Sequence, residues 1–197
     1  MFVQVIQGKV KDADLLARQS ERWVAEIKPG VKGYLGSTTG VTPDGRAITI
    51  ARFESAQAAA ANSGNAQQTA WWNETAKAYD GEPTFIDCTE VDTLFGGGSD
   101  DAGFVQVIQG RAKDQAAMRK EVTSMETALR TERPDILGIT MAWHGTAGDF
   151  TQVVYFRSEA ETRQAEKAKE NDELRRRYES LFAGPPTFFD LRTPLLD

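Results

Sequence analysis

The chain contains few of the residues that build metal, redox and disulfide sites. Its 197 residues include one cysteine, Cys88, and one histidine, His144. A single cysteine excludes an internal disulfide and a paired-cysteine motif, and a single histidine excludes a multi-histidine metal site within one chain. The phosphate-binding loop, the dinucleotide-binding glycine motif and the serine-hydrolase signatures are also absent from the sequence. We therefore expect neither a metal site nor a bound cofactor.

Long apolar runs are missing as well. No segment approaches the roughly 20 apolar residues that a membrane-spanning helix needs, and Met1 to Val5 lack the basic and apolar regions of a secretion signal. The formal net charge of -6 disfavours binding to nucleic acid, because phosphate recognition needs clustered lysine and arginine. The one basic cluster, 175–177, is surrounded by acidic residues and is typical of a solvated helix face. We expect a cytoplasmic protein that binds neither nucleic acid nor membrane.

What the sequence does contain is a long internal repeat. The heptapeptide FVQVIQG stands at 2–8 and again at 104–110, and the tripeptide PTF stands at 83–85 and again at 186–188. The offset between the copies changes only from 102 to 103 along the chain. A repeat of about 95 residues is too long for a solenoid unit and fits a small domain.

The two copies are separated by a segment with the composition of a flexible linker. Residues 96–103 read GGGSDDAG, which is rich in glycine and aspartate. We therefore predict a first repeat over 1–95, a linker over 96–103 and a second repeat over 104–197.

Each repeat predicts the same order of elements, βαββαβ. The first repeat shows a strand at 2–7, a helix from Asp12 to Pro29, strands at 33–42 and 46–54, a helical region at 55–79 and a last strand from Pro83. The second repeat places its two middle strands at 136–144 and 149–156. This order indicates an α+β fold of the ferredoxin-like plan, in which a four-stranded antiparallel sheet carries two helices on one face. Because the other face must be covered, we predict that the two sheets pack together as an internal pseudo-dimeric α/β barrel.

The order of elements and two short motifs suggest a family. The Phe53-Glu54-Ser55 step into a helix and the later Ala70-Trp71-Trp72 resemble the dimeric α/β barrel superfamily, in particular its antibiotic-biosynthesis-monooxygenase-like domains. The resemblance covers nearly the whole chain, once per repeat. It implies a cavity between the sheet and the helices of each half. The activities it implies include cofactor-independent oxygenation of aromatic polyketides, haem degradation, and isomerase or decarboxylation steps, and fold alone does not choose among them.

Two aromatic residues of the first repeat are candidate ligand contacts. Trp72 stands where the second repeat has Arg175, and the resemblance implies that a tryptophan on this helix holds a planar substrate. Tyr79 follows two helical turns later and aligns with Phe182, so a hydroxyl bond to a substrate oxygen is available in the first repeat only. The alternatives are a structural or surface role for Trp72 and core packing for Tyr79.

The repeated strand carries a polar residue in each copy. Gln4 and Gln106 share a face with apolar neighbours, so each amide needs a partner, which is either a neighbouring side chain or a ligand. Asp87 and Asp190 recur on the last strand of each repeat, and a shared strand-end hydrogen bond explains them more simply than paired-carboxylate catalysis.

His144 is the remaining candidate. It ends a predicted strand beside Trp143, where it serves either as a turn residue or, if a cavity opens beside it, as a general base. Haem-binding relatives carry their iron ligand on the second helix, and neither 55–80 nor 158–182 contains a histidine. Haem ligation of that kind is therefore not expected.

Together these patterns predict a small-molecule-binding α/β-barrel protein. One hypothesis is a cofactor-independent monooxygenase that acts on a planar aromatic or polyketide-like substrate in the first-repeat cavity, beside Gln4, Trp72 and Tyr79. The other is a non-enzymatic ligand-sensing or stress-related interaction module, since no strong catalytic constellation is present. The chain acts either as a monomeric pseudo-dimer or as a homodimer.

Overall fold

The two heptapeptides form equivalent strands, each flanked by two antiparallel neighbours. The computed structural model describes residues 1–168 and 172–197 and divides them into two compact units. Phe2 lies opposite Phe53 in one sheet, as Phe104 lies opposite Phe156 in the other. The sequence repeat is therefore a repeat of strand register.

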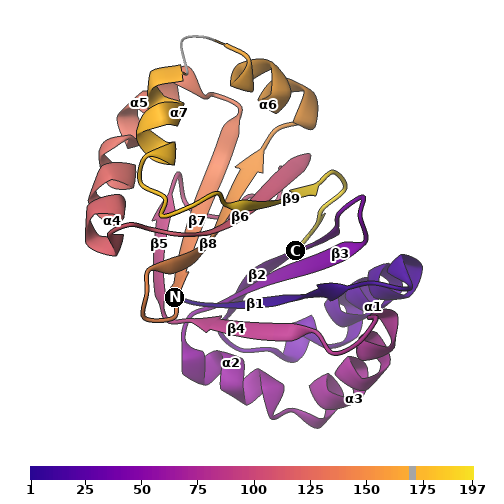
Figure 1. Cartoon of the computed structure of the whole chain (residues 1–197). Coiled ribbons are helices and arrows are strands. Elements are labelled where there is room, and N and C mark those ends of the chain that lie inside the picture. Colours follow the sequence, from indigo (N-terminus) through magenta and orange to yellow (C-terminus); the bar gives the residue numbers. More distant parts are fainter. Residues whose placement is uncertain (169–171) are drawn as a thin grey trace. The chain divides into compact units, whose positions relative to one another are not determined.

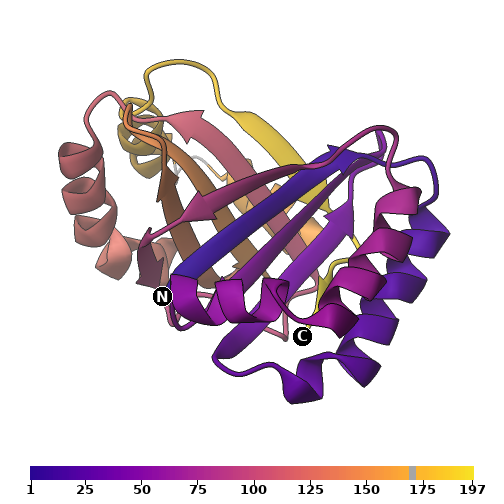
Figure 2. The same ribbon diagram turned by 90° about the horizontal axis from the view of Figure 1, so that it is seen from below.

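The first unit comprises 1–90 and 194–197. Its strands are β1 (Phe2–Lys9), β2 (Tyr34–Val41), β3 (Arg46–Phe53), β4 (Thr84–Cys88) and β10 (Leu195–Leu196), in the order β10-β2-β3-β1-β4. Its helices are α1 (Ala13–Glu26), α2 (Ala56–Ser63) and α3 (Ala66–Thr75), with short 3-10 turns at Lys28–Gly30 and Ala76–Ala78. All three α-helices lie on one face of the sheet (Figures 1 and 2).

The second unit comprises 91–193. Its strands are β5 (Glu90–Leu94), β6 (Phe104–Arg111), β7 (Ile136–His144), β8 (Asp149–Phe156) and β9 (Thr187–Leu191), in the order β5-β7-β8-β6-β9. Its helices are α4 (Gln115–Ser124), α5 (Glu126–Glu132), α6 (Glu159–Glu166) and α7 (Asp172–Glu179). The predicted α+β fold with two βαββαβ repeats is confirmed. No helix within the described part of the chain has the length and apolar character to span a membrane.

Each sheet has one strand more than the four that the sequence predicted. β5 follows the last strand of the first repeat but joins β7, and β10 follows the last strand of the second repeat but joins β2, where Leu195 pairs with Thr39. Each repeat therefore supplies the fifth strand of the other repeat's sheet. The signal in the sequence is weak because β10 has only two residues.

This exchange places the unit boundaries away from the predicted ones. The units divide after Glu90 and after Thr193, whereas the sequence suggested 1–95, a linker at 96–103, and 104–197. The glycine-rich segment belongs to the second unit and packs closely there, since a Cβ on Gly138 would collide with the Gly97 carbonyl oxygen. The predicted packing of one sheet on the other stays a prediction.

Equivalent side chains start the helices in both units. The Asp12 carboxylate accepts a hydrogen bond of 2.8 Å from the Leu15 amide at the start of α1, and Asp114 accepts one of 2.9 Å at the start of α4. The helical region at 55–79 is interrupted where Asn65 caps α3. These caps fix where each helix begins above its sheet.

The alternation of side chains along β1 separates the two faces of the first sheet. Gln4 and Ile6 point to the face that carries the helices, where both line a cavity. Val3 and Val5 point to the other face and are fully buried. The polar residue of the heptapeptide therefore lies on the helix side.

Candidate functional site

Each unit has a cavity between its sheet and its helices, but the two cavities differ greatly in size. The first-unit cavity has a volume of about 90 Å³, whereas the second-unit cavity has about 810 Å³. Pockets for small organic ligands occupy several hundred cubic ångströms, so the second-unit cavity has a suitable size and the first-unit cavity does not.

The lining of the second-unit cavity is mainly apolar. The sheet contributes a floor of residues that share one face: Gln106, Ile108, Ile139, Gln152, Val154 and Phe156. The helices and the segment before β9 contribute walls that include Val122, Met125, Leu129, Leu174, Tyr178, Phe182 and Phe188. Such a lining favours an apolar ligand that is oriented by a few polar groups.

Two of the polar groups on the floor are glutamine amides in fixed orientations. The Gln106 amide nitrogen donates a hydrogen bond of 2.8 Å to Asp190, which is also ion-paired with Arg163. The Tyr178 hydroxyl donates a hydrogen bond of 2.6 Å to the amide oxygen of Gln152. Burial raises the pKa of Tyr178 above its ordinary value, so this hydroxyl stays protonated at neutral pH.

These contacts leave one end of each amide available. Among the described residues, the Gln106 amide oxygen and the Gln152 amide nitrogen form no hydrogen bond. Gln106 and Gln152 lie diagonally on the adjacent strands β6 and β8, because Ile108 pairs with Gln152 and Gln106 with Val154. The floor of the cavity therefore offers an acceptor and a donor close together.

Aromatic side chains fill the corresponding space in the first unit. Phe53 and five other rings line its cavity. Phe53 has a phenylalanine counterpart, Phe156, whereas the second repeat has mostly smaller or aliphatic residues in place of the other five rings. These five rings are Trp23, Tyr34, Trp71, Trp72 and Tyr79, and their counterparts are Met125, Ile136, Leu174, Arg175 and Phe182. The larger rings contribute to the smaller volume of the first-unit cavity.

The first-unit rings are held in place by contacts with one another and with polar groups. The ring centroids of Trp23 and Tyr34 are 4.8 Å apart. The Trp23 indole N–H donates to Gln68 at 2.7 Å, and the Trp71 indole N–H donates to the Gln19 carbonyl at 2.7 Å. Their positions are therefore fixed by the fold of this unit.

Gln4, Trp72 and Tyr79, which the sequence singled out as candidate ligand contacts, all line the first-unit cavity. Gln4 donates a hydrogen bond of 2.8 Å to Asp87, so its amide already has a protein partner. Tyr79 is buried, and burial raises its pKa to about 12. Its hydroxyl has no hydrogen-bond partner among the described residues. These side chains reduce the volume of the cavity that they line.

His144 lies apart from both cavities. It shares the face of β7 with Ala142, whereas the second-unit cavity is lined from the Ile139 side of the strand. Its Nε2 is 3.3 Å from the Thr151 hydroxyl, and burial lowers its pKa below the ordinary value. The described residues that line either cavity do not include it.

Two polar residues of the site, Gln152 and Tyr178, were not predicted from the sequence. Their counterparts in the first repeat are the smaller polar residues Thr49 and Thr75. The available signal was the position of Gln152, which alternates with Val154 on the same strand face as Gln106. No cluster of three or more metal-ligating side chains occurs among the residues that the structure describes.

Several solved structures share this fold along the whole chain. Candidate monooxygenases from Fusobacterium nucleatum and Lactobacillus acidophilus are 11% and 14% identical to it and give TM-scores of 0.77 and 0.74. Both alignments cover 100% of this chain, with 93% of the Fusobacterium chain and 98% of the Lactobacillus chain. An anthrone oxidase-like protein is 9% identical over 100% of this chain and 92% of its own, with a TM-score of 0.69.

No protein-family model matches the chain, and no curated protein matches it. Identities at this level establish the fold alone. Solved structures with this fold also include a Listeria monocytogenes protein related to antibiotic biosynthesis monooxygenases. The chain therefore has the ferredoxin-like fold of the monooxygenase-like proteins that its sequence resembles.

Proposed function

We propose that the protein binds a planar aromatic, polyketide-like compound in the second-unit cavity and oxidises it with molecular oxygen, without a cofactor. The observation that carries this proposal is the 810 Å³ cavity, whose apolar walls surround the amides of Gln106 and Gln152. A flat ring system fits between the apolar walls, and its carbonyl and hydroxyl groups match the donor and the acceptor on the floor. This proposal places the ligand in the second unit, whereas the sequence suggested the cavity of the first repeat.

Anthrone illustrates the chemistry. Its methylene carbon, opposite the carbonyl carbon in the central ring, loses a proton to the solvent to give an electron-rich enolate that passes an electron to oxygen. The two resulting radicals combine to a peroxide anion, which takes up a proton from the solvent to become a hydroperoxide and then loses water to leave a ketone. One molecule of anthrone and one of oxygen thus give anthraquinone and water. The protein supplies orientation and a dry pocket, and the Gln152 N–H stabilises the enolate oxygen.

The choice of this substrate class has two supports. The cavity volume exceeds that of a tricyclic ring system, and one protein of the same fold is named as anthrone oxidase-like. Every described residue that lines the cavity belongs to the second unit, so we also propose that a single chain is sufficient for binding.

The test compares binding of alizarin, a dihydroxyanthraquinone, with oxidation of anthrone. Met125→Trp places in the second unit the ring that the first unit has at Trp23, and we expect it to abolish both. Gln152→Leu removes the amide while keeping a side chain of similar length, and should lower oxidation more than alizarin binding. His144→Asn, on the other face of the sheet, is the matched control and should change neither.

Failure of the wild-type protein to bind alizarin would refute the proposal. Binding that depends on Met125, combined with anthrone oxidation no faster than in buffer, would instead support a ligand-sensing role. Oxygen uptake and the appearance of the anthraquinone absorption band give two independent measures of turnover.

A further inference from the structure

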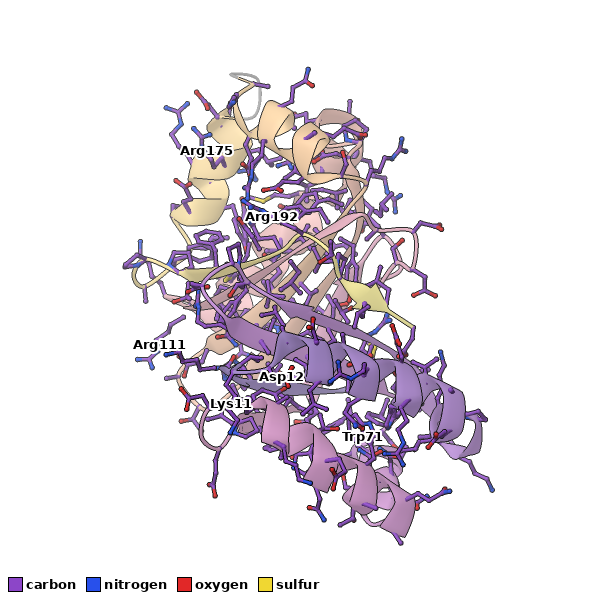
Figure 3. The ribbon with its side chains drawn as sticks, turned by 90° about the vertical axis from the view of Figure 1, so that its right-hand side faces the viewer. Lys11, Asp12, Trp71, Arg111, Arg175 and Arg192 are labelled. Atoms are coloured by element: carbon purple, nitrogen blue, oxygen red, sulfur yellow. The ribbon has the colours of Figure 1, made fainter. Side chains whose placement is uncertain are left out.

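The first unit shows what a ring bound in the second unit would contact. Trp72 on α3 and Arg175 on α7 occupy equivalent positions, with the same offset of 103 that relates Thr84 at the start of β4 to Thr187 at the start of β9. Figure 3 labels Arg175 on α7 and Trp71, the residue before Trp72, on α3. The same position therefore carries an indole in the first unit and a guanidinium in the second.

The Trp72 indole lies among three other rings. Its centroid is 5.1 Å from that of Phe85, in an edge-to-face arrangement, 6.0 Å from that of Trp71 and 6.2 Å from that of Tyr79. Offset and edge-to-face arrangements at such distances are favourable for aromatic pairs. These three side chains therefore form an environment that accommodates an aromatic ring, and in the first unit the Trp72 indole occupies it.

The second unit retains the walls of this environment. Phe188 and Phe182 stand where the first unit has Phe85 and Tyr79, and Leu174 stands in place of Trp71. All three line the 810 Å³ cavity. Phe188 is 48% exposed, close to the 49% of Phe85, so the edge strand holds both phenylalanines in similar settings.

Arg175 leaves this space open because other groups hold its side chain near the surface. Its guanidinium donates a hydrogen bond of 2.7 Å to Asp172 and another of 3.1 Å to the Glu166 carbonyl. The side chain is 48% exposed. It lies at the rim of the cavity and does not fill the space that the Trp72 indole fills in the first unit.

We propose that the second-unit cavity contains a subsite for one flat aromatic ring, bounded by Phe188, Phe182 and Leu174, at the place equivalent to the Trp72 indole. The inference rests on the proposed function for the ligand class, and it adds where the terminal ring binds. A tricyclic ligand placed there extends past the subsite towards the amides of Gln106 and Gln152. The edge-to-face contact of Trp72 with Phe85 predicts the same geometry between the ligand and Phe188.

The test is to install the missing indole. Arg175→Trp is expected to lower alizarin affinity roughly tenfold or more, because the new side chain competes for the subsite, and Arg175→Ala should stay within about threefold of the wild type. Both variants lose the same charge, so only the filling of the subsite separates them. Circular dichroism and thermal unfolding establish that each variant is folded.

A second pair of variants keeps the inference testable if Arg175→Trp does not fold. Phe188→Leu should weaken alizarin binding about fivefold, whereas Phe85→Leu, its counterpart in the first unit, should leave binding unchanged. Equal affinities for the wild type, Arg175→Trp and Phe188→Leu would overturn the subsite while the proposed function stands. Absence of alizarin binding by the wild type would refute the proposed function itself.

Discussion

Gln106 donates a hydrogen bond of 2.8 Å to Asp190, which lies directly opposite it on the neighbouring strand, and Gln4 repeats this contact with Asp87 at 2.8 Å. A carboxylate only accepts hydrogen bonds, so each amide must turn its nitrogen to the aspartate. The shared strand-end hydrogen bond that the sequence suggested for the two aspartates is thus present in both units. In the second unit it leaves the amide oxygen of Gln106 available to a ligand.

The two pairs should differ in their contribution to stability. Gln106 is 8% exposed and Asp190 also pairs with Arg163, whereas the Gln4–Asp87 pair is exposed. We expect Asp190→Leu to lower the free energy of unfolding by about 2 kcal/mol, because it leaves a buried amide unpaired, and Asp87→Leu by less than about 1 kcal/mol. Urea unfolding of both variants measures the difference, and equal losses would contradict this account.

The glycine that ends each heptapeptide is explained by a close aromatic ring. A Cβ on Gly8 would lie 2.9 Å from Cδ1 of Tyr79, and one on Gly110 would lie 3.1 Å from Cζ of Phe150. We expect Gly8→Ala to cost about 1–3 kcal/mol through overpacking. Gly30→Ala is the matched control, since a methyl group at Gly30 would meet no other atom within 4 Å. Its thermal midpoint should stay at or above that of the wild type, and a similar loss in both variants would rule out the steric cause.

Two tyrosine hydroxyls should respond differently to removal. The Tyr79 hydroxyl has no hydrogen-bond partner among the described residues, and the second repeat has phenylalanine at this position. Tyr79→Phe should therefore change the free energy of unfolding by no more than about 0.5 kcal/mol. Tyr178→Phe removes the donor to Gln152 and leaves a buried amide oxygen unpaired, so it should cost about 1–2 kcal/mol. Chemical denaturation followed by circular dichroism gives both values, and a larger loss for Tyr79→Phe would show that its hydroxyl has a partner.

The sequence predicted the regular elements well because their signals are local. The strands at 136–144 and 149–156 have the predicted bounds, and Asp12 caps the first helix as expected. The open cavity could not be predicted in the same way, because its volume depends on side chains from several elements together. Trp72 suggested a ligand contact by itself, yet beside Trp23 and Trp71 it helps to fill the first-unit cavity.

The exchange of the edge strands β5 and β10 could not be predicted from local sequence patterns, for a related reason. β5 has five residues and β10 has two, and each joins a sheet whose other strands come from the other repeat. Pairing over such separations leaves no periodicity in the sequence. The one residue in the sequence that reflects this pairing is Gly138, because only glycine allows the Gly97 backbone, which follows β5, to approach so closely.

The only histidine should make stability, but not ligand binding, depend on pH near neutrality. Burial lowers the pKa of His144, while the nearby Asp149, which is ion-paired with Arg111 at 2.7 Å, acts in the opposite direction. As the pH falls below the ordinary value of about 6.5, the unfolded chain binds a proton that the folded protein does not. Stability should therefore fall with the pH until the folded pKa is reached, by clearly less than the limit of about 1.4 kcal/mol per pH unit, because solvent screens this half-buried group.

His144→Gln separates the effect of the histidine from that of the carboxylates. In this variant the free energy of unfolding should no longer fall between about pH 6.5 and the lower folded pKa of His144, while its decrease at more acidic pH should be unchanged. Unfolding free energies of both proteins across this range give the comparison. Because His144 is on the face of β7 away from the second-unit cavity, alizarin affinity should not follow the same titration. An affinity that changed with the His144 pKa would place this side chain at the ligand, and would return it to the catalytic candidates.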